Sequence, residues 1–232
     1  MEIEKEPRNY YDYFVQKVRI EQEKIKLNRN FDEFDIRTPF REYFKTFDCL
    51  EVEDGWQIDC YYAHSNTGGK PVIYVRKPDE DIDELLSRID NKRYMYDHRI
   101  FEYCQSVNTI DHLKVTDIEK GLFQLLMLDM IGEDFAIYWH AGYGRKTMIC
   151  SKRELYEISE KILDKERKSE IEKANDFPTI EESKDCITYR ILTFNSWRGL
   201  AEESYSIKKA FPHKISLIEA KILVSYDCGL RY

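Results

Sequence analysis

The chain has 232 residues, of which 42% are hydrophobic and 34% are charged. Its 12 Phe, 17 Tyr and 3 Trp can fill a sizeable core, and 9 Gly and 6 Pro are too few for a low-complexity linker. The N-terminus is charged from residue 2, and the longest strongly apolar stretch, residues 121–128, is well short of the ~20 residues that a membrane span requires. These features argue against an exported or membrane protein and predict a cytoplasmic one.

The formal net charge of −8 is unevenly distributed along the chain. Residues 184–232 hold eight Lys and Arg against five Asp and Glu, a balance of +3, so residues 1–183 carry −11. An acidic chain disfavours nucleic-acid binding, because phosphate contacts require clustered Lys and Arg. The asymmetry is compatible with an acidic interaction surface or with an ordinary solvated one.

The six cysteines are spread widely, and none forms a CxxC pair or a zinc-type spacing with another. The sequence therefore predicts free thiols in a reducing compartment, no bound metal and no cofactor.

The first predicted element is a helix that begins after Asn9, since apolar residues recur at helical spacing. The apolar positions are Tyr11, Phe14, Val15, Val18 and Ile25. Residues 47–53 then predict a short strand, which the turn pair Asp54-Gly55 joins in a hairpin to a strand over 56–62. The segment SNTGGK predicts a loop that leads to a third strand over 72–76.

The middle of the chain predicts three helices. The first opens at Pro78 and carries an apolar stripe as far as Ile89, and the second covers residues 96–107. Thr116 and Glu119 have the spacing of a capping box, which predicts a third helix that stops near Gly132.

The C-terminal part alternates between strands and helices. Residues 135–140 and 147–150 predict a hairpin around AGYGRK, and Ser151 with Glu154 predicts a long capped helix that ends before Pro178. A strand over 186–194, a helix near Ser196 and a strand over 218–226 complete the prediction.

The order of these elements predicts the fold class. Because strands arrive in hairpins that are followed by helices, we expect an α+β fold with a largely antiparallel sheet and helices packed after each hairpin. We expect one domain over residues 1–232, and two lobes, 1–112 and 113–232, are the alternative.

Two stretches of the sequence, YYAHSNTGGKPVIYV and IYWHAGYGRKTMIC, share one pattern 76 residues apart. The matched residues are His64, Gly68 and Lys70 in the first and His140, Gly144 and Lys146 in the second. The match is compatible with an internal ββα duplication.

Glycine-rich turns beside basic side chains can bind anions, since backbone N–H groups and cations converge there. Together with Arg145, the six matched residues form a candidate site for a phosphorylated ligand or nucleotide. Neither stretch is a Walker loop, which requires GxxxxGK[ST] before a helix. Two ordinary hairpin turns explain the same residues.

Two other patterns involve carboxylates. Residues 79–83 hold four acids but lack the glycine and final glutamate of a calcium loop, so helix capping is the simpler interpretation. Glu219 and Lys221 share one face of a predicted strand, an arrangement similar to the metal-binding half of restriction-type nucleases. The acid expected on a preceding strand is missing, because Glu202 and Glu203 fall in a predicted helix, and a polar strand face is the alternative.

Tyr10, Tyr11 and Tyr13 cluster near the N-terminus, and tyrosine is enriched at protein interfaces. Nucleophile and metal motifs such as GxSxG and HExxH do not occur. We therefore expect an acidic protein-binding module of inhibitor or immunity type, without catalytic residues, whose partner is another protein with a basic surface. Binding or turnover of a phosphorylated ligand by the two stretches is the alternative, and a metal-dependent nuclease is a weaker one.

Overall fold

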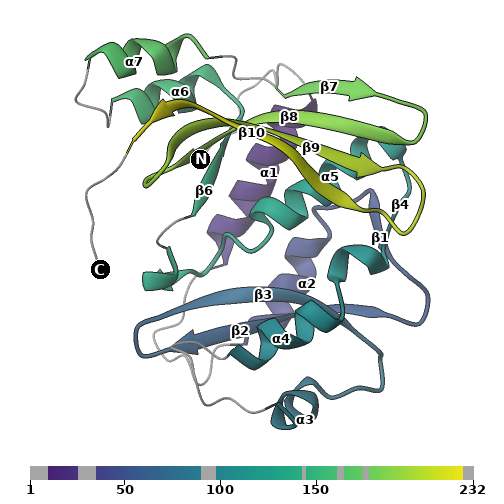
Figure 1. Ribbon diagram of the computed structural model, residues 1–232. Coiled ribbons are helices and arrows are strands. Elements are labelled where there is room, and N and C mark those ends of the chain that lie inside the picture. The colour runs from purple at the N-terminus through teal and green to yellow at the C-terminus, as the bar shows by residue number, and fades with distance from the viewer. Residues whose placement is uncertain are drawn as a thin grey trace. The chain divides into compact units, whose positions relative to one another are not determined.

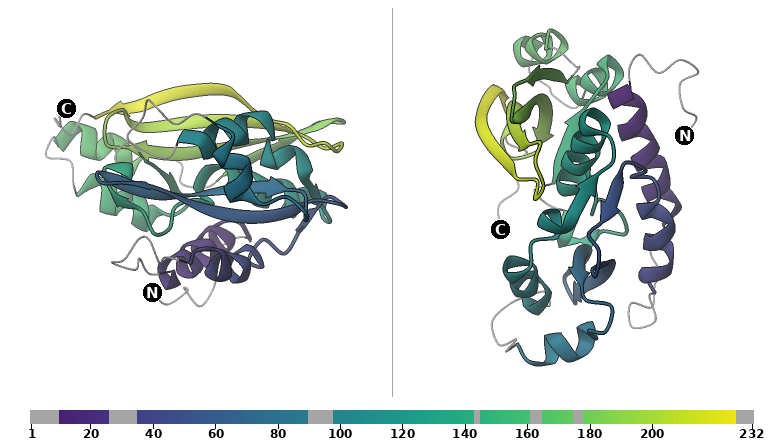
Figure 2. Two further views of the ribbon diagram at one scale, coloured as in Figure 1. Left: turned by 90° about the horizontal axis from the view of Figure 1, so that it is seen from below. Right: turned by 90° about the vertical axis from the view of Figure 1, so that its right-hand side faces the viewer.

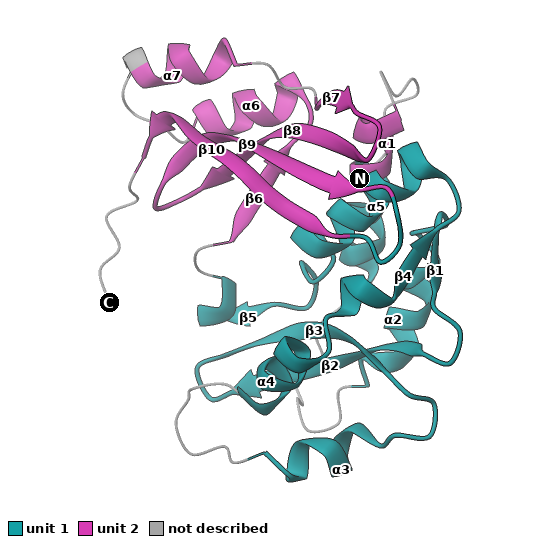
Figure 3. Cartoon of the chain, turned by 45° about the vertical axis from the view of Figure 1, so that its right-hand side comes forward, with its two compact units in different colours: residues 1, 16–143, 210–213 teal, residues 2–15, 144–209, 214–232 magenta. Residues whose placement is uncertain are grey.

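Helices and antiparallel strands alternate along the chain in the computed structural model (Figure 1), which confirms the predicted α+β class. The structure describes residues 10–25, 35–89, 98–142, 145–160, 165–174 and 178–226. The chain divides into two compact units, coloured separately in Figure 3. Unit 1 comprises residues 1, 16–143 and 210–213, and unit 2 comprises residues 2–15, 144–209 and 214–232. The boundary predicted for two lobes, after residue 112, lies within unit 1.

The helices of the first part of the chain begin with α1, Tyr10–Lys24, whose last nine residues belong to unit 1. The others are α2 (Arg37–Phe44), α3 (Ile82–Ser87), α4 (His98–Ser106) and α5 (Ile118–Ile131), with the 3₁₀ helices η2 (Thr109–His112) and η3 (His140–Gly142). The predicted cap at Asn9 lies outside the described residues.

Two small antiparallel sheets belong to unit 1. In one, β2 (Gln57–Ser65) and β3 (Gly68–Arg76) form a long hairpin, visible as the blue ribbon in Figure 2, and β5 (Tyr138–Trp139) pairs with the start of β3. In the other, β1 (Leu50–Val52) pairs with β4 (Leu113–Val115). The predicted SNTGGK loop is therefore wrong, because Ser65 already pairs with Gly68 and the two glycines belong to β3.

The turn predicted at Asp54-Gly55 is present, and Gly55 adopts the positive φ of +79° that such turns favour. It does not make the predicted hairpin, since β1 pairs with β4 and β2 pairs with β3. A turn sets only the local reversal of the chain, whereas the strand partner is chosen by burial, here of Leu50 and Leu113.

Helix α5 is buried from Gly121 to Leu128 and again at Ile131, and the polar Gln124 is among the buried residues. Its N-cap is Asp117, which accepts a hydrogen bond from the backbone N–H of Lys120, so the predicted capping role of Thr116 is wrong. Gly132 is the C-cap, as predicted. At this end the buried Tyr43 hydroxyl donates to the Gly132 carbonyl oxygen at 3.0 Å, and the Gln22 amide donates to the Tyr43 hydroxyl at 3.0 Å.

Unit 2 contains a five-stranded antiparallel sheet in the order β10-β9-β8-β6, with β7 also paired to β8. The strands are β6 (Lys146–Ile149), β7 (Thr179–Glu182), β8 (Cys186–Asn195), β9 (Gly199–Lys208) and β10 (Ile215–Ser225). The helices α6 (Lys152–Ser159) and α7 (Lys165–Glu172) contribute Leu155, Ile158 and Ile171 to an apolar cluster with the sheet (Figure 1). One long helix was predicted here, and residues 161–164, between α6 and α7, lie outside the described part.

Two predictions for unit 2 are wrong. The helix predicted near Ser196 is strand β9, because Gly199 (φ +94°) reverses the chain and lets β9 pair along β8 for ten residues. A Cβ at Gly199 would lie 2.0 Å from the Val224 carbonyl oxygen, so β10 can approach here only because the residue is glycine. The hairpin predicted around AGYGRK is also absent, since β5 pairs with β3 whereas β6 pairs with β8.

The two similar stretches thus differ in their strand pairing, and the internal duplication stays a prediction.

Among the described residues, no helix combines the length and apolar character needed to cross a membrane.

Candidate functional site

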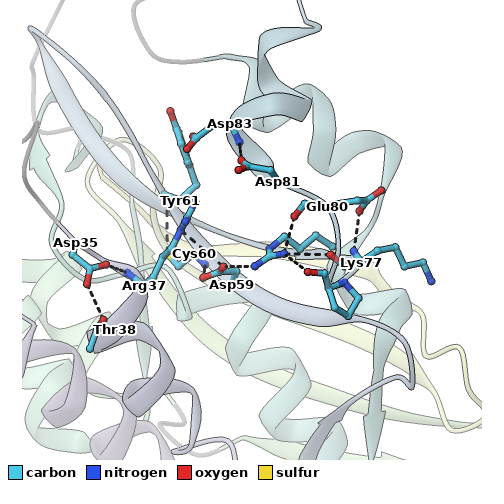
Figure 4. A network of polar contacts seen from close by, with 12 residues as sticks. Asp35, Arg37, Thr38, Asp59, Cys60, Tyr61, Lys77, Glu80, Asp81 and Asp83 are labelled. Carbon is cyan, nitrogen blue, oxygen red and sulfur yellow. Dashed lines mark hydrogen bonds and ion pairs between the residues drawn. The ribbon is translucent and has the colours of Figure 1, made fainter.

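A buried carboxylate connects two arginines in unit 1 (Figure 4). The side chain of Asp59, on β2, is 0% exposed, and its Oδ2 lies 3.4 Å from Arg76 Nη2 and 3.9 Å from Arg37 Nε. Its Oδ1 accepts a hydrogen bond from the backbone N–H of Cys60 at 3.0 Å. The strand register produces this contact, because Asp59 lies opposite Tyr74 and therefore diagonal to Arg76 on the same face of the hairpin.

Arg76 also holds the turn that follows β3. Its Nη1 donates to the carbonyl oxygens of Lys77 (3.3 Å), Pro78 (3.3 Å) and Glu80 (2.8 Å). The Glu80 carboxylate accepts from the backbone N–H of Lys77 at 2.8 Å. Arg76 is thus occupied by the protein itself, whereas the side chain of Arg37 is 41% exposed.

The two arginines and the 78–82 turn line a cavity of about 300 Å³. Asp79 and Asp81 are exposed at its rim, and Glu80 is half-buried. Asp81 caps α3 by accepting from the backbone N–H groups of Asp83 and Glu84, which confirms the capping interpretation of the acidic run. Three acidic residues, Asp79, Glu80 and Asp81, therefore line the cavity together with the two arginines, and the buried Asp59 pairs with both arginines.

Behind the cavity, the Tyr74 hydroxyl is buried beside Asp59, and it has no hydrogen-bond partner among the described residues. Burial and the neighbouring Asp59 charge both raise the pKa of Tyr74 above its usual value. The hydroxyl is therefore protonated at neutral pH and lacks the acceptor that it would normally have.

Replacing Tyr74 with Phe is expected to raise the free energy of unfolding by about 1 kcal/mol, since a buried unsatisfied hydroxyl costs ~1–3 kcal/mol. Urea denaturation of the two proteins measures the difference. Tyr43→Phe is the matched control, because the Tyr43 hydroxyl is hydrogen-bonded. This substitution is expected to lower the free energy of unfolding by about 1 kcal/mol. Equal destabilisation by both changes would mean that a bound water satisfies Tyr74.

A second cavity of unit 1, of about 260 Å³, is lined by Cys104, Asp129 and Glu133. The Glu133 carboxylate accepts from the backbone N–H of Ile73 at 2.8 Å and lies 3.3 Å from Lys70 Nζ. Burial, and then the charge of Glu133, raise the pKa of Cys104 to about 12. Its thiol is thus protonated at neutral pH and is a poor nucleophile.

The seven residues of the predicted anion site are divided between the two units. His64, Gly68, Lys70 and His140 belong to unit 1, Arg145 and Lys146 belong to unit 2, and Gly144 lies outside the described residues. Within unit 1 the backbone N–H of His140 donates to the Thr67 carbonyl oxygen at 3.2 Å, so η3 lies against the turn of the β2–β3 hairpin.

The two lysines of that predicted site are engaged by carboxylates. Lys70 pairs with Glu133, and its Nζ lies 5.0 Å from the centre of the Phe101 ring. In unit 2, Lys146 Nζ donates to both carboxylate oxygens of Glu203, at 2.7 and 3.1 Å. Both lysine side chains are thus partly exposed, at 35% and 39%, and each is paired with a carboxylate.

Glu203 is itself an unpredicted feature of unit 2. The residue is 5% exposed on β9, where the Tyr205 hydroxyl also donates to it at 2.7 Å. The pairing is non-local, because Lys146 lies on β6 and is 57 residues away in the sequence.

The nuclease pattern lies on β10, where Glu219 is opposite Ser204 and Lys221 is opposite Glu202. Glu202 was expected in a helix, but it lies on the neighbouring strand β9, opposite Lys221. Even so, no three His, Cys, Asp or Glu side chains in the described part of the chain are placed to hold a metal ion.

Tyr10, Tyr11 and Tyr13, the predicted interface residues, lie half-buried in the first turn of α1. The Tyr10 ring contacts those of Tyr11 and Phe14, with ring centres 5.6 and 6.0 Å apart. Their role at an interface stays a prediction.

Comparisons with known proteins give no relative from which a function could be transferred. No protein-family model matches the chain, and neither curated proteins nor solved structures gave a significant match.

Proposed function

We propose that the protein is a non-catalytic module that binds a basic protein through the acidic rim of the Arg37–Arg76 cavity. The observation that carries this proposal is the charge of the rim, where Asp79, Glu80 and Asp81 accompany the buried Asp59. A cavity of about 300 Å³ is at the small end of ligand pockets, which span ~300–1,000 Å³, and suits one inserted side chain. A lysine or arginine of a partner would meet carboxylates on entry.

The distribution of charge along the chain supports the same proposal. In the sequence, the residues of unit 1 hold 17 Lys and Arg against 25 Asp and Glu, so unit 1 carries the whole formal net charge of −8. An acidic surface increases the rate at which a basic partner associates, by long-range attraction. A phosphorylated ligand is the less favoured alternative, because Lys70 and Lys146 are already paired with carboxylates.

The test begins with capture of partners from the native cell on the immobilised protein, followed by binding kinetics with the purified partner. We expect the association rate constant to fall about tenfold between 50 and 300 mM salt, since the Debye length shrinks below ~10 Å. Asp79→Lys should slow association at low salt more than Asp54→Lys, an equal charge change at another exposed aspartate of unit 1. The dissociation rate constant should change less.

Three outcomes would contradict the proposal: association that is insensitive to salt, equal effects of the two lysine variants, or turnover of a small substrate by the purified protein. Calorimetric titration with common nucleotides is expected to give no binding heat. Binding that Lys70→Ala weakens would favour the phosphorylated-ligand alternative instead.

A further inference from the structure

Strand β10 forms an edge of the unit 2 sheet. It pairs with β9 on one side, and no other strand among the described residues pairs with it. Residues 217–222 are all exposed, and three of them are large apolar residues: Leu217 (51%), Ile218 (59%) and Ile222 (56%). A long edge strand with exposed apolar side chains is a template for pairing with a further strand.

The middle of β10 is regular. Its register with β9 is continuous from Glu219 to Ile222 and shifts by one residue on either side of this stretch. Such bulges limit how far an edge can pair, but they leave the central residues in extended alternation. Glu219 and Lys221 therefore share one face of the sheet, and Ala220 and Ile222 share the other.

The exposed segment is complementary to itself when two copies run in opposite directions. It reads Ile218-Glu219-Ala220-Lys221-Ile222, so isoleucines flank an acid and a base on either side of alanine. If two copies pair antiparallel with Ala220 opposite Ala220, each Glu219 lies opposite Lys221 of the other copy. Each Ile218, which lies at the bulge just before the regular stretch, is then next to Ile222 of the other copy. Opposite charges and paired β-branched side chains are the cross-strand combinations that stabilise antiparallel sheets.

We propose that β10 is the interface of a homodimer, in which two copies pair antiparallel about Ala220 and their unit 2 sheets become continuous. The arrangement is isologous, since a two-fold axis through Ala220 makes both charge pairs and both isoleucine pairs at once. It covers the exposed Ile218 and Ile222 and gives the free backbone groups of the edge hydrogen-bond partners. This interface does not involve the acidic cavity of unit 1, so the homodimer and the proposed function can fail separately.

Charge exchange at residues 219 and 221 provides the test, with the dimer dissociation constant measured by analytical ultracentrifugation. In the proposed homodimer, residue 219 of each copy lies opposite residue 221 of the other, so there are two such pairs. Glu219→Lys makes both of them Lys–Lys pairs, and Lys221→Glu makes both of them Glu–Glu pairs. Each variant is expected to weaken the homodimer at least about tenfold. Lys214→Glu, the same charge change at an exposed lysine just before β10, should leave the dissociation constant unchanged.

Mixing the two weakened variants is the decisive step. Because one chain then presents two lysines and the other two glutamates, the mixture should form heterodimers about as tightly as the parent protein forms homodimers. Co-purification through different tags on the two chains detects them, and thermal melts show whether each variant is folded. A parent protein that is monomeric at 100 µM, or variants that dimerise as well as the parent protein, would overturn the proposal. Failure of the folded variants to pair in the mixture would overturn it too.

Discussion

Replacing Asp59 with Asn is expected to lower the free energy of unfolding by about 3 kcal/mol, because it leaves buried positive charge without a counter-ion. The Asp59 carboxylate is fully buried, and the Arg76 side chain that faces it is only 15% exposed. Asparagine keeps the shape of the side chain, so the decrease in the free energy of unfolding measures the contribution of the carboxylate charge. Arg37 contributes less to this effect, since it is farther from the carboxylate and more exposed.

Urea denaturation followed by far-UV circular dichroism measures the Asp59 effect, with Asp54→Asn as the matched control. Asp54 is also a unit 1 aspartate in an ion pair, but it is fully exposed and lies 3.9 Å from Lys114. The control should change the free energy of unfolding by less than ~0.5 kcal/mol. Equal values for the two variants would show that the arginine network does not stabilise unit 1.

Lys146→Met is expected to destabilise unit 2 by about 2–3 kcal/mol, because it leaves the buried Glu203 carboxylate with Tyr205 as its remaining described side-chain donor. The long apolar stem is kept, so the change mainly removes the ammonium group. This differs from the behaviour of an exposed ligand-binding lysine, whose replacement should weaken binding and leave stability almost unchanged.

A double-mutant cycle with Glu203→Gln isolates the Lys146–Glu203 interaction. The loss of unfolding free energy in the double variant should be smaller than the sum of the losses in the two single variants. With glutamine at position 203, removal of the lysine no longer leaves a buried carboxylate without its counter-ion. Arg190→Met provides the control in the same sheet, because its pair with Glu181 is exposed on both sides and should contribute less than ~1 kcal/mol. Additive effects of the two changes would contradict the proposed pairing.

Periodicity in the sequence predicted the elements whose buried faces are regular. Helix α1 buries Phe14, Val15 and Val18, and β8 buries every second residue over much of its length, so both were identified. Strand β9 was missed because Glu202, Glu203 and Ser204 interrupt its apolar alternation. Glu203 is buried in spite of its charge, and the reason is non-local, since Lys146 lies on another strand of the sheet.

The candidate site shows the same limit. In the predicted strand over 56–62, apolar residues alternate with polar ones, which indicates that Cys60 is buried and Asp59 faces solvent. Both are buried, because the side chains of α3 and α4 pack on the second face of the hairpin as well. One indication of a buried ion pair was present in the sequence here, namely that the acidic Asp59 lies between Ile58 and Cys60. Its partners Arg37 and Arg76 could not be assigned without the strand register and the position of α2.

The way in which the chain is shared between the two units restricts how either unit can be isolated from the other. Within the described residues, the backbone passes from one unit to the other after residue 15, between residues 142 and 145, and after residues 209 and 213. The short segment 210–213 is counted with unit 1, where the Phe211 ring lies 5.8 Å from Lys114 Nζ. Neither unit is formed by one continuous segment of the amino-acid sequence. Removing residues from one end of the chain would therefore not isolate either unit.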